Sequence, residues 1–280
     1  MLRCLRSLTD QSYPRDHFEI IVVDDGSHPP IDRLAVPFEK DIQFRLICQE
    51  RKGAASARNS GAEQARGKYL AFTDDDCCPH SSWLHHLAEC CNKFPEAAVT
   101  GKTLNLLEEN AYASTAQLLI DYLYAYYNAS PQRARFLTSN NFALPAASFR
   151  ALGGFHTEFP AAGGEDREFC DRWLSKSLSV IYLPEAIVFH VHSMTLAGFV
   201  KQQFNYGRGA FHFNRLRSSR SGALFSIEPP AFYIDMFRYP YLKQKTLNAH
   251  LSTLLFAFSQ GVNLAGFAFE GLAYHVRAQD

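Results

Sequence analysis

The chain has 280 residues, with 28 Lys plus Arg against 28 Asp plus Glu, so its formal net charge is zero. Proteins that bind nucleic acid through its phosphates normally carry a basic excess, so this balance excludes nucleic-acid binding. Because 47% of the residues are hydrophobic and 14% are aromatic, the chain can bury a sizeable core and disorder is not expected. The length fits one large domain, or one domain with an appendage.

The seven cysteines form two adjacent pairs and three single positions. They are Cys4, Cys48, Cys77, Cys78, Cys90, Cys91 and Cys170. No two of them have the C-x-x-C spacing, and no signal-peptide pattern precedes them. We therefore expect reduced thiols and a cytoplasmic location.

Short β-branched runs alternate with helical patterns in the first hundred residues. Strands are predicted over 18–23, 42–48 and 68–73, and helices over 54–66 and 81–94. Such alternation favours an open α/β architecture with a mostly parallel sheet. In sheets of this kind, ligands bind outside the carboxyl ends of the strands.

Two acidic motifs fall at predicted strand ends, DDG at 24–26 and DDD at 74–76. Carboxylates there can hold a divalent cation, accept hydrogen bonds from a ribose or base, or accept a proton. An ordinary turn is the alternative for DDG, and a solvated loop before a helix is the alternative for DDD. A bound cation would relieve the repulsion among three adjacent carboxylates, which favours a ligand site at DDD.

A third acidic motif follows two glycines, in the stretch Gly163-Gly164-Glu165-Asp166. It opens a predicted helix whose apolar face carries Phe169, Trp173 and Leu174. The helix dipole stabilises carboxylates in a first turn in their ionised form. Helix capping alone is the alternative explanation of this motif.

Four segments in combination resemble the family-2 glycosyltransferases of the GT-A fold. They are SLTDQSYPRDHFEIIVVDDGS, RKGAASARNSGAEQARGKYLAFTDDDC, the SNNFAL…GGFHTEF…GGEDREFCDRW segment, and PEAIVFHVHS. The resemblance covers roughly residues 2 to 215, in the order and at the spacing of the family. It implies an α/β, Rossmann-like open mixed sheet flanked by helices over residues 1–225, followed by a C-terminal helical appendage over 226–280.

The resemblance also implies roles for particular residues. Asp24 and Asp25 correspond to a pair near the nucleotide base, and Arg58 lies on the nucleotide side of the cleft. Asp74 and Asp76 correspond to the outer members of the D-x-D signature. They are expected to hold the ribose and a Mg²⁺ or Mn²⁺ ion on the diphosphate.

The same comparison makes Asp166 the general base, with Glu165 beside it as a second catalytic carboxylate. His190 is expected to be a metal ligand or to contact the diphosphate. His192 lies two residues further along the same predicted strand. Only one of the two imidazoles is expected to face the cleft, and a local hydrogen bond is the alternative for both. The implied reaction moves a sugar from a UDP- or GDP-linked donor to a hydroxyl of a glycan or lipid-linked acceptor, with inversion. We expect this reaction to serve cell-envelope polysaccharide or glycolipid synthesis.

The chain begins with MLRCLRSLTDQ, which the resemblance places inside the first helix of the family. We therefore expect the strand that usually pairs with 18–23 to be missing, which makes an inactive sugar-nucleotide-binding or scaffold protein an alternative. A zinc-binding module is a further alternative. Its candidate ligands are Cys77, Cys78, His80, His85, His86, Cys90 and Cys91.

Two helices are expected beyond residue 193. The first spans TLAGFVKQQFNYGRGAFHFNRLRSSR and carries Lys201, Arg208, Arg215, Arg217 and Arg220. The second, 251–272, has a stripe of polar or small residues that leaves a wide apolar face. The stripe comprises Ser252, Ser259, Asn263, Gly266 and Glu270. An interfacial or partner-packed helix, a membrane-spanning helix and a buried core helix all fit this pattern. With the upstream basic residues, it predicts a peripheral position at the inner face of the cytoplasmic membrane.

Overall fold

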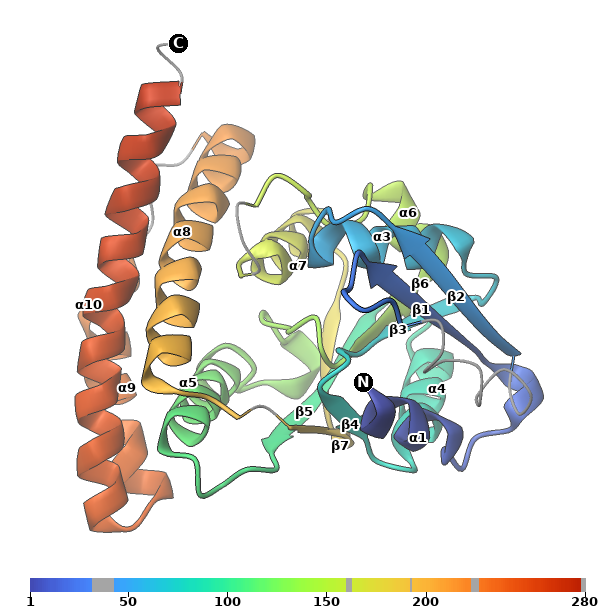
Figure 1. Ribbon diagram of the computed structural model, residues 1–280, viewed down its shortest axis with the longest axis horizontal. Helices are drawn as coiled ribbons and strands as arrows, with labels where there is room; N and C mark the ends of the chain where they lie inside the picture. The colour runs from blue at the N-terminus through green and yellow to red at the C-terminus, as the bar shows by residue number, and fades with distance from the viewer. Residues whose placement is uncertain (32–42, 160–162, 192, 223–226, 278–280) are drawn as a thin grey trace. The chain divides into compact units, whose positions relative to one another are not determined.

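The computed structural model describes residues 1–31, 43–159, 163–191, 193–222 and 227–277 (Figure 1). The chain forms two units. The first consists of Met1–Leu106, Ser130–Thr157 and Phe169–Val191, and the second of Leu107–Ala129, Glu158–Glu168 and His192–Asp280. The predicted domain boundary near residue 225 stays a prediction.

Among its described residues, the first unit contains seven strands and the helices predicted over 54–66 and 81–94. In chain order its elements are α1 (Leu2–Thr9), the 3-10 helix Arg15–His17, β1 (Glu19–Asp25), β2 (Gln43–Gln49), α3 (Ala54–Gln64), β3 (Tyr69–Phe72), β4 (Cys77–Pro79), α4 (Trp83–Lys93), β5 (Ala98–Asn105), the 3-10 helix Pro131–Arg133, β6 (Phe142–Pro145), α6 (Ala146–Ala151) and β7 (Val180–His190). Helix α7 (Glu165–Ser175) contributes its residues from Phe169 onward to this unit.

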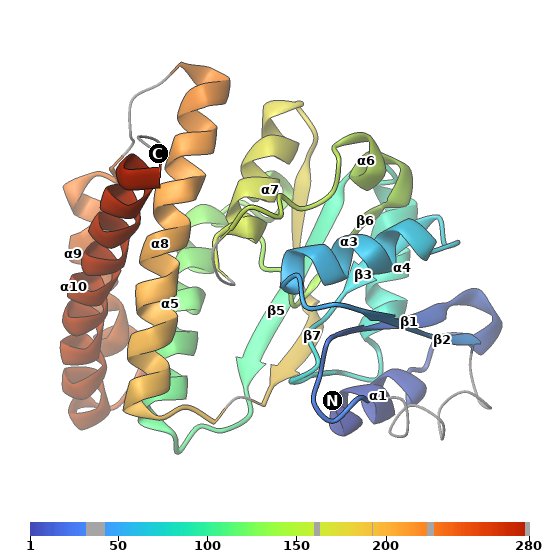
Figure 2. The same ribbon diagram turned by 45° about the horizontal axis from the view of Figure 1, so that its top comes forward.

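A two-stranded sheet carries the DDG motif at its carboxyl end. Strands β1 and β2 pair in parallel from Glu19 opposite Gln43 to Asp25 opposite Gln49. Ile20 is buried against Leu5 of α1, and Phe44 packs on the same cluster. Helix α3 packs beside β1, as Figure 2 shows. The predicted strands and helix here are confirmed, although α3 ends at Gln64 rather than at residue 66.

The larger sheet has five strands in the order β3-β6-β5-β7-β4. Only β5 and β7 pair in parallel, and the other three pairings are antiparallel. The expectation of a mostly parallel sheet is therefore wrong for this sheet, and the mixed sheet that the family resemblance implies is confirmed. The reason is that β6 lies between β3 and β5 and runs antiparallel to both.

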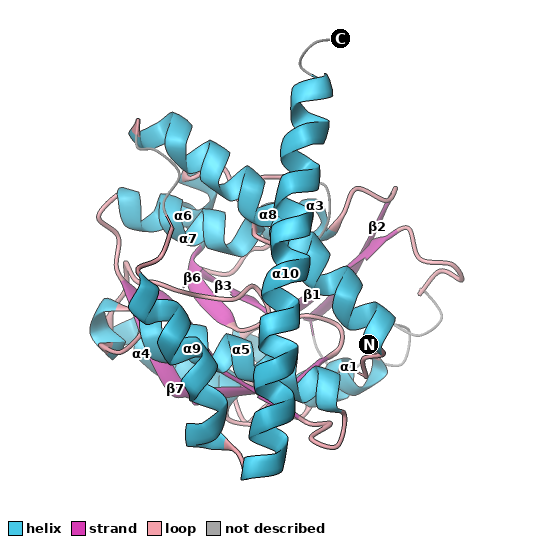
Figure 3. Ribbon diagram, turned by 90° about the vertical axis from the view of Figure 1, so that its left-hand side faces the viewer, coloured by secondary structure: helices cyan, strands magenta, loops and turns pink. Residues whose placement is uncertain are grey.

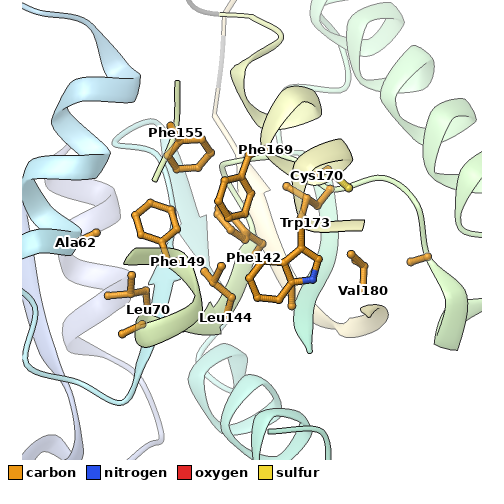
Figure 4. Close-up of a cluster of buried hydrophobic side chains, with 14 residues drawn as sticks. Ala62, Leu70, Phe142, Leu144, Phe149, Phe155, Phe169, Cys170, Trp173 and Val180 are labelled. Carbon is orange, nitrogen blue, oxygen red and sulfur yellow. The ribbon is translucent and has the colours of Figure 1, made fainter. Parts of the chain in front are cut away.

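Side chains alternate between the two faces of this sheet, as the period of a strand requires. On one face, Phe142 and Leu144 of β6 pack with Phe169 and Trp173 of α7 (Figure 4). On the other face, Ala143 of β6 packs against a cluster that α4 covers. Trp83, Leu87 and Cys91 of α4 are all nearly fully buried in this cluster. Burial on both faces of this sheet fixes the end of β3, which the DDD motif follows.

The second unit consists of helices. They are α5 (Ala111–Tyr127), the first turn of α7, α8 (Leu196–Ser221), α9 (Pro230–Lys243) and α10 (Thr246–Arg277). Helices α8 and α10 lie side by side, and α9 lies beside α10 (Figures 2 and 3). Gly207 and Gly266 permit this close approach, because a Cβ atom on either would overlap a carbonyl oxygen of the facing helix. The helices predicted beyond residue 193 are confirmed.

Candidate active site

The three aspartates after β3 have three different surroundings. Asp74 Oδ1 accepts a hydrogen bond of 2.6 Å from the Arg58 guanidinium. Asp75 is exposed to solvent. Asp76 Oδ2 lies 3.1 Å from Nε2 of His190, the last residue of β7. The crowding of like charges is therefore relieved by one cation, by water and by one imidazole. The structure brings Arg58, Asp74, Asp76 and His190 together around this turn.

Asp25 positions the segment that carries Arg58. Its carboxylate accepts backbone N–H bonds from Lys52 at 2.8 Å and from Gly53 at 2.7 Å, and a side-chain bond from Gln49 at 2.7 Å. Burial acts to raise the pKa of Asp25, but these hydrogen bonds outweigh it and hold the pKa below its usual value. Gly53 has a φ of +92° and precedes the first residue of α3, so Asp25 fixes the turn into that helix.

Asp24 stabilises the neighbouring turn. It is buried, and its carboxylate accepts the backbone N–H groups of Ser27 at 2.8 Å and Ile31 at 3.3 Å. Burial acts to raise the pKa of Asp24, but the bonds from Ser27 and Ile31 outweigh it, and the pKa is lowered. The turn role considered for DDG is thus present in both aspartates, and their contact with a nucleotide stays a prediction.

One group of side chains can converge on a metal ion. Ligand atoms of Asp76, Cys77 and His190 all lie within 4.8 Å of one another. Cys77 is fully buried, and this burial raises the pKa of its thiol, so it stays protonated and is a poor ligand. Burial acts to lower the pKa of His190, but its hydrogen bond with the Asp76 carboxylate outweighs this, and the pKa is raised.

Carboxylate oxygen and imidazole nitrogen are suitable ligands for Mn²⁺, and carboxylate oxygen for Mg²⁺. The residues present therefore fit the predicted cation. Cys77 was missed as a neighbour of this site, because the sequence placed it only among candidate zinc ligands. Its position directly after the aspartates was the available signal. His192, the second predicted imidazole, lies outside the described residues.

The other candidate zinc ligands do not form a site in the part of the chain that the structure describes. Cys90 and Cys91 lie in the apolar cluster beneath α4. His85 lies 3.3 Å from Glu89, and His80 contacts the hydroxyl of Ser82. The crowding of these residues in the sequence therefore reflects helix packing and surface contacts.

Glu165 and Asp166 belong to the second unit and differ in environment. Glu165 is buried, and its Oε2 atom accepts the N–H of Gly163 at 2.7 Å. Asp166 is partly exposed, and its Oδ1 atom accepts the N–H of Arg167 at 2.7 Å. Glu165 therefore holds the glycine loop in shape, whereas part of Asp166 is open to solvent.

The glycine loop, Gly163–Gly164, packs against Gly209 of α8. Gly163 and Gly164 have φ angles of +135° and +99°, which side chains rarely permit. A Cβ atom on Gly209 would overlap the carbonyl oxygen of Gly163. Sequence reasoning missed Gly209. The signal was a glycine inside a predicted helix, where it lowers stability and usually has a packing reason.

Comparisons with known proteins bear on the family of this chain. The sequence profile described as glycosyl transferase family 2 matches residues 1–153, more than half of the chain. A second profile, described as the N-terminal domain of galactosyltransferase, matches residues 126–194. The chain is also similar to glycosyltransferase AglE of Haloferax volcanii, with 43% identity over 84 residues, 29% of this chain and 28% of that protein. Matches to the first three curated relatives cover 28% to 41% of their length, less than two thirds of each.

Two solved structures share the fold. One is the mannosyltransferase PcManGT from Pyrobaculum calidifontis in complex with GDP-Man and Mn²⁺, with a TM-score of 0.60 and 17% identity, covering 98% of this chain and 75% of that one. The other is S. aureus TarS 1-349 in complex with UDP-GlcNAc, with a TM-score of 0.53 and 14% identity, covering 97% and 86%. These likenesses show a GT-A fold, and the sequence profile shows the family. The chain belongs to glycosyl transferase family 2.

Proposed function

We propose that this glycosyltransferase moves a sugar from a nucleotide-sugar donor to an acceptor hydroxyl and inverts the anomeric configuration. The observation that carries this proposal is the turn after β3, where Asp74 pairs with Arg58 and Asp76 pairs with His190. GDP-Man in PcManGT and UDP-GlcNAc in TarS support a UDP- or GDP-linked donor.

Donor binding is assigned to the first unit. Asp74 accepts hydrogen bonds from the ribose, Arg58 neutralises negative charge beside it, and Asp24 and Asp25 border the nucleotide base. The Arg58–Asp74 pair holds both side chains in place before the donor arrives, which lowers the entropy cost of binding.

The divalent cation, Mg²⁺ or Mn²⁺, is assigned to Asp76, His190 and Asp74. When bound, it neutralises the charge that develops on the departing nucleoside diphosphate. In this assignment the Asp76 carboxylate and the His190 imidazole, which contact each other, would each supply a ligand atom to the ion. Mn²⁺ in PcManGT supports the choice of cation.

Asp166 is the proposed base. An acceptor oxygen forms a bond to the anomeric carbon, the bond from that carbon to the phosphate oxygen breaks, and its electron pair leaves with the diphosphate. The hydroxyl proton passes to the Asp166 carboxylate. Partial exposure of Asp166 and burial of Glu165 favour Asp166 for this role.

The proposed acceptor is a glycan or lipid-linked saccharide of the cell envelope, used at the inner face of the cytoplasmic membrane.

An inactive sugar-nucleotide-binding or scaffold protein is the second candidate function. It is favoured by the internal hydrogen bonds that the carboxylates of Asp24 and Asp25 already accept.

The test is nucleoside diphosphate release from a panel of UDP- and GDP-sugars, with Mn²⁺ or EDTA, in the presence of extracted membrane glycolipids. Proton NMR of the product should show that the transferred sugar has the anomeric configuration opposite to that of the donor. Donor binding without turnover for any donor would favour the inactive candidate. Retention of configuration would contradict the inverting mechanism.

A further inference from the structure

The polar stripe of α10 faces the protein, and its apolar side faces solvent. Ser252, Ser259 and Glu270 are almost fully buried. Asn263 donates to Gln203 Oε1 of α8 at 3.0 Å. The exposed side, here called the apolar face of α10, consists of Leu247, Leu251, Leu254, Phe258, Leu264, Phe269, Leu272 and Val276.

This orientation is the reverse of a helix on a water-soluble protein, where polar residues face out and apolar residues face in. Leu254, Leu264 and Leu272 are 68% to 70% exposed. Helix α10 is also long and apolar enough to cross a membrane by length and composition, and only 22% of its most apolar window is buried. A core helix is therefore excluded, and the apolar face needs a non-aqueous contact.

The chemistry of this face fits lipid better than a second copy of the chain. Among residues 246–276, the only Asp, Glu, Lys or Arg is Glu270, which is buried. In coiled-coil interfaces between protein chains, the apolar stripe of each helix is narrow and is bordered by charged residues. The apolar face of α10 is bordered instead by Ala257, Ala265 and Ala268, which are exposed as well. A wide apolar surface without a charged rim suits hydrocarbon.

Exposed cations lie where α9 leads into α10. Arg238, Lys243 and Lys245 are exposed there, against a single exposed carboxylate, Asp235. Tyr241 and Leu242 are exposed between them, at 46% and 76%. Aromatic and basic residues beside an apolar face are typical of contact with an anionic headgroup layer.

Three of the five cations of α8, in contrast, form ion pairs within the protein. Arg208 contacts Glu270, Arg215 contacts Glu158, and Arg220 contacts Glu168. Most of the basic residues that the sequence analysis linked to membrane binding are thus already paired with carboxylates of the protein. The α9–α10 connection supplies the positive charge instead.

The contacts of Glu270 distinguish an α10 that lies in the membrane plane from an α10 that spans the membrane. Its carboxylate accepts from Arg208 Nε at 2.6 Å and lies 3.1 Å from Nε2 of His212, both on α8. A spanning α10 would either lose these partners or carry α8 and its arginines into hydrocarbon, and both are costly. In addition, 31 residues of helix measure about 46 Å, well beyond a hydrocarbon core of about 30 Å.

We propose that α9 and α10 dock on an anionic membrane surface, with α10 lying in the membrane plane and its apolar face buried below the headgroups. The inference deepens the membrane position given under the proposed function and rests on it only for the side of the membrane. Docking itself requires no donor, acceptor or metal ion, so it is measured without them.

The first test is flotation of the full-length protein with two kinds of vesicle, pure phosphatidylcholine and an equal mixture with phosphatidylglycerol. Simultaneous Leu254→Glu, Leu264→Glu and Leu272→Glu substitutions should lower the bound fraction at least about ten-fold. Leu196→Glu is the matched control, because Leu196 is an exposed leucine outside the face, and it should bind normally. Joint Lys243→Gln and Lys245→Gln substitutions should abolish the preference for the anionic vesicles.

The second test measures depth. A tryptophan at position 254, 264 or 272 should be quenched by brominated lipid to the same shallow depth in all three variants. The native Trp83 and Trp173 are fully buried, so brominated lipid does not reach them and their emission is a constant background, measured with the wild type and subtracted. A central maximum of depth would show a spanning helix and overturn the proposal. Unchanged flotation of the triple variant would overturn it too. So would a wild-type dimer in sedimentation velocity that binds no vesicles and becomes monomeric in the triple variant, because a second copy would then cover the face.

Discussion

The Asp76 carboxylate lies 3.1 Å from the His190 imidazole, although 114 positions separate the two residues in the chain. Antiparallel pairing of β4 with β7 produces this contact, since Cys77 lies opposite His190 in that register. The backbone N–H of Val191 also donates to the carbonyl oxygen of Asp76 at 2.8 Å. The sheet therefore holds the two side chains together without any ligand.

His190→Gln should weaken metal-assisted nucleotide binding about ten-fold and leave metal-free nucleotide binding unchanged. The amide keeps a polar group in place but is a weaker ligand than an imidazole. Calorimetry with GDP and UDP, with and without Mn²⁺, measures both quantities. His80→Gln is the control, because His80 is an exposed histidine just after β4 whose ring nitrogen contacts the hydroxyl of Ser82. An equal loss of metal-assisted nucleotide affinity in both variants would argue against His190 as a metal ligand.

Asp166→Asn should lower turnover by roughly 10² to 10⁴ with donor binding intact, since the amide cannot accept the proton. Glu165→Gln should cost less, because an amide oxygen can still accept the N–H of Gly163. Initial rates at saturating donor give the comparison. If Glu165→Gln abolishes transfer while Asp166→Asn retains it, the base is the neighbouring residue.

Gly209→Ala should displace the Gly163–Gly164 loop and lower turnover by about 10- to 100-fold, because small misplacements of a catalytic group are costly. Nucleotide affinity should not change, since the donor residues are on other elements. Gly261→Ala is the matched control: it also lies in a helix, and its added methyl meets nothing within 4 Å. Full activity of Gly209→Ala would mean that the loop shifts without consequence for catalysis.

Local signals in the sequence predicted the acidic strand ends well. The runs before Asp24 and Asp74 are β-branched or aromatic, and each is followed by a turn, so both strands and both motifs were found. Strands β5 and β6 were missed because β6 is buried throughout and the first four residues of β5 are buried, which removes the alternation that identifies a strand. The strand directions depend on pairing between distant segments, which no local pattern reports.

The candidate site was predicted as a set of residues, but not as a set of contacts. The sequence could not show that Asp25 holds the turn before α3, or that Asp74 pairs with Arg58, because these contacts join different elements. Likewise, the periodicity of α10 identified a polar and an apolar side but not which side faces α8. That orientation depends on Arg208 and His212, whose side chains lie within hydrogen-bond distance of the Glu270 carboxylate and hold it against α8.

Glu270→Gln should lower the free energy of unfolding by about 2 to 4 kcal/mol at neutral pH, because a buried ion pair loses one partner. Burial acts to raise the pKa of Glu270, but hydrogen bonds from Arg208 and His212 outweigh it and lower the pKa. The stabilisation is therefore complete above the unfolded value near 4.5 and is lost as the pH falls through the lower folded value.

Urea unfolding of wild type and Glu270→Gln across this range measures the effect. The difference between the two proteins should be constant near neutral pH and shrink in acid. A difference that is absent at neutral pH, or equally large in acid, would show that the Glu270 charge does not stabilise the pairing of α8 with α10.

The central claim, a divalent-cation site for a nucleotide sugar at the turn after β3, is tested most directly by calorimetric titration of the full-length protein with GDP and UDP in Mn²⁺ or in EDTA. The account predicts that affinity for at least one nucleotide falls at least about ten-fold in EDTA. It also predicts that Asp76→Asn removes the Mn²⁺ effect, whereas Asp75→Asn, at the exposed middle position of the same run, retains it. Equal affinity in Mn²⁺ and EDTA, or loss of the effect in Asp75→Asn but not in Asp76→Asn, would contradict the account.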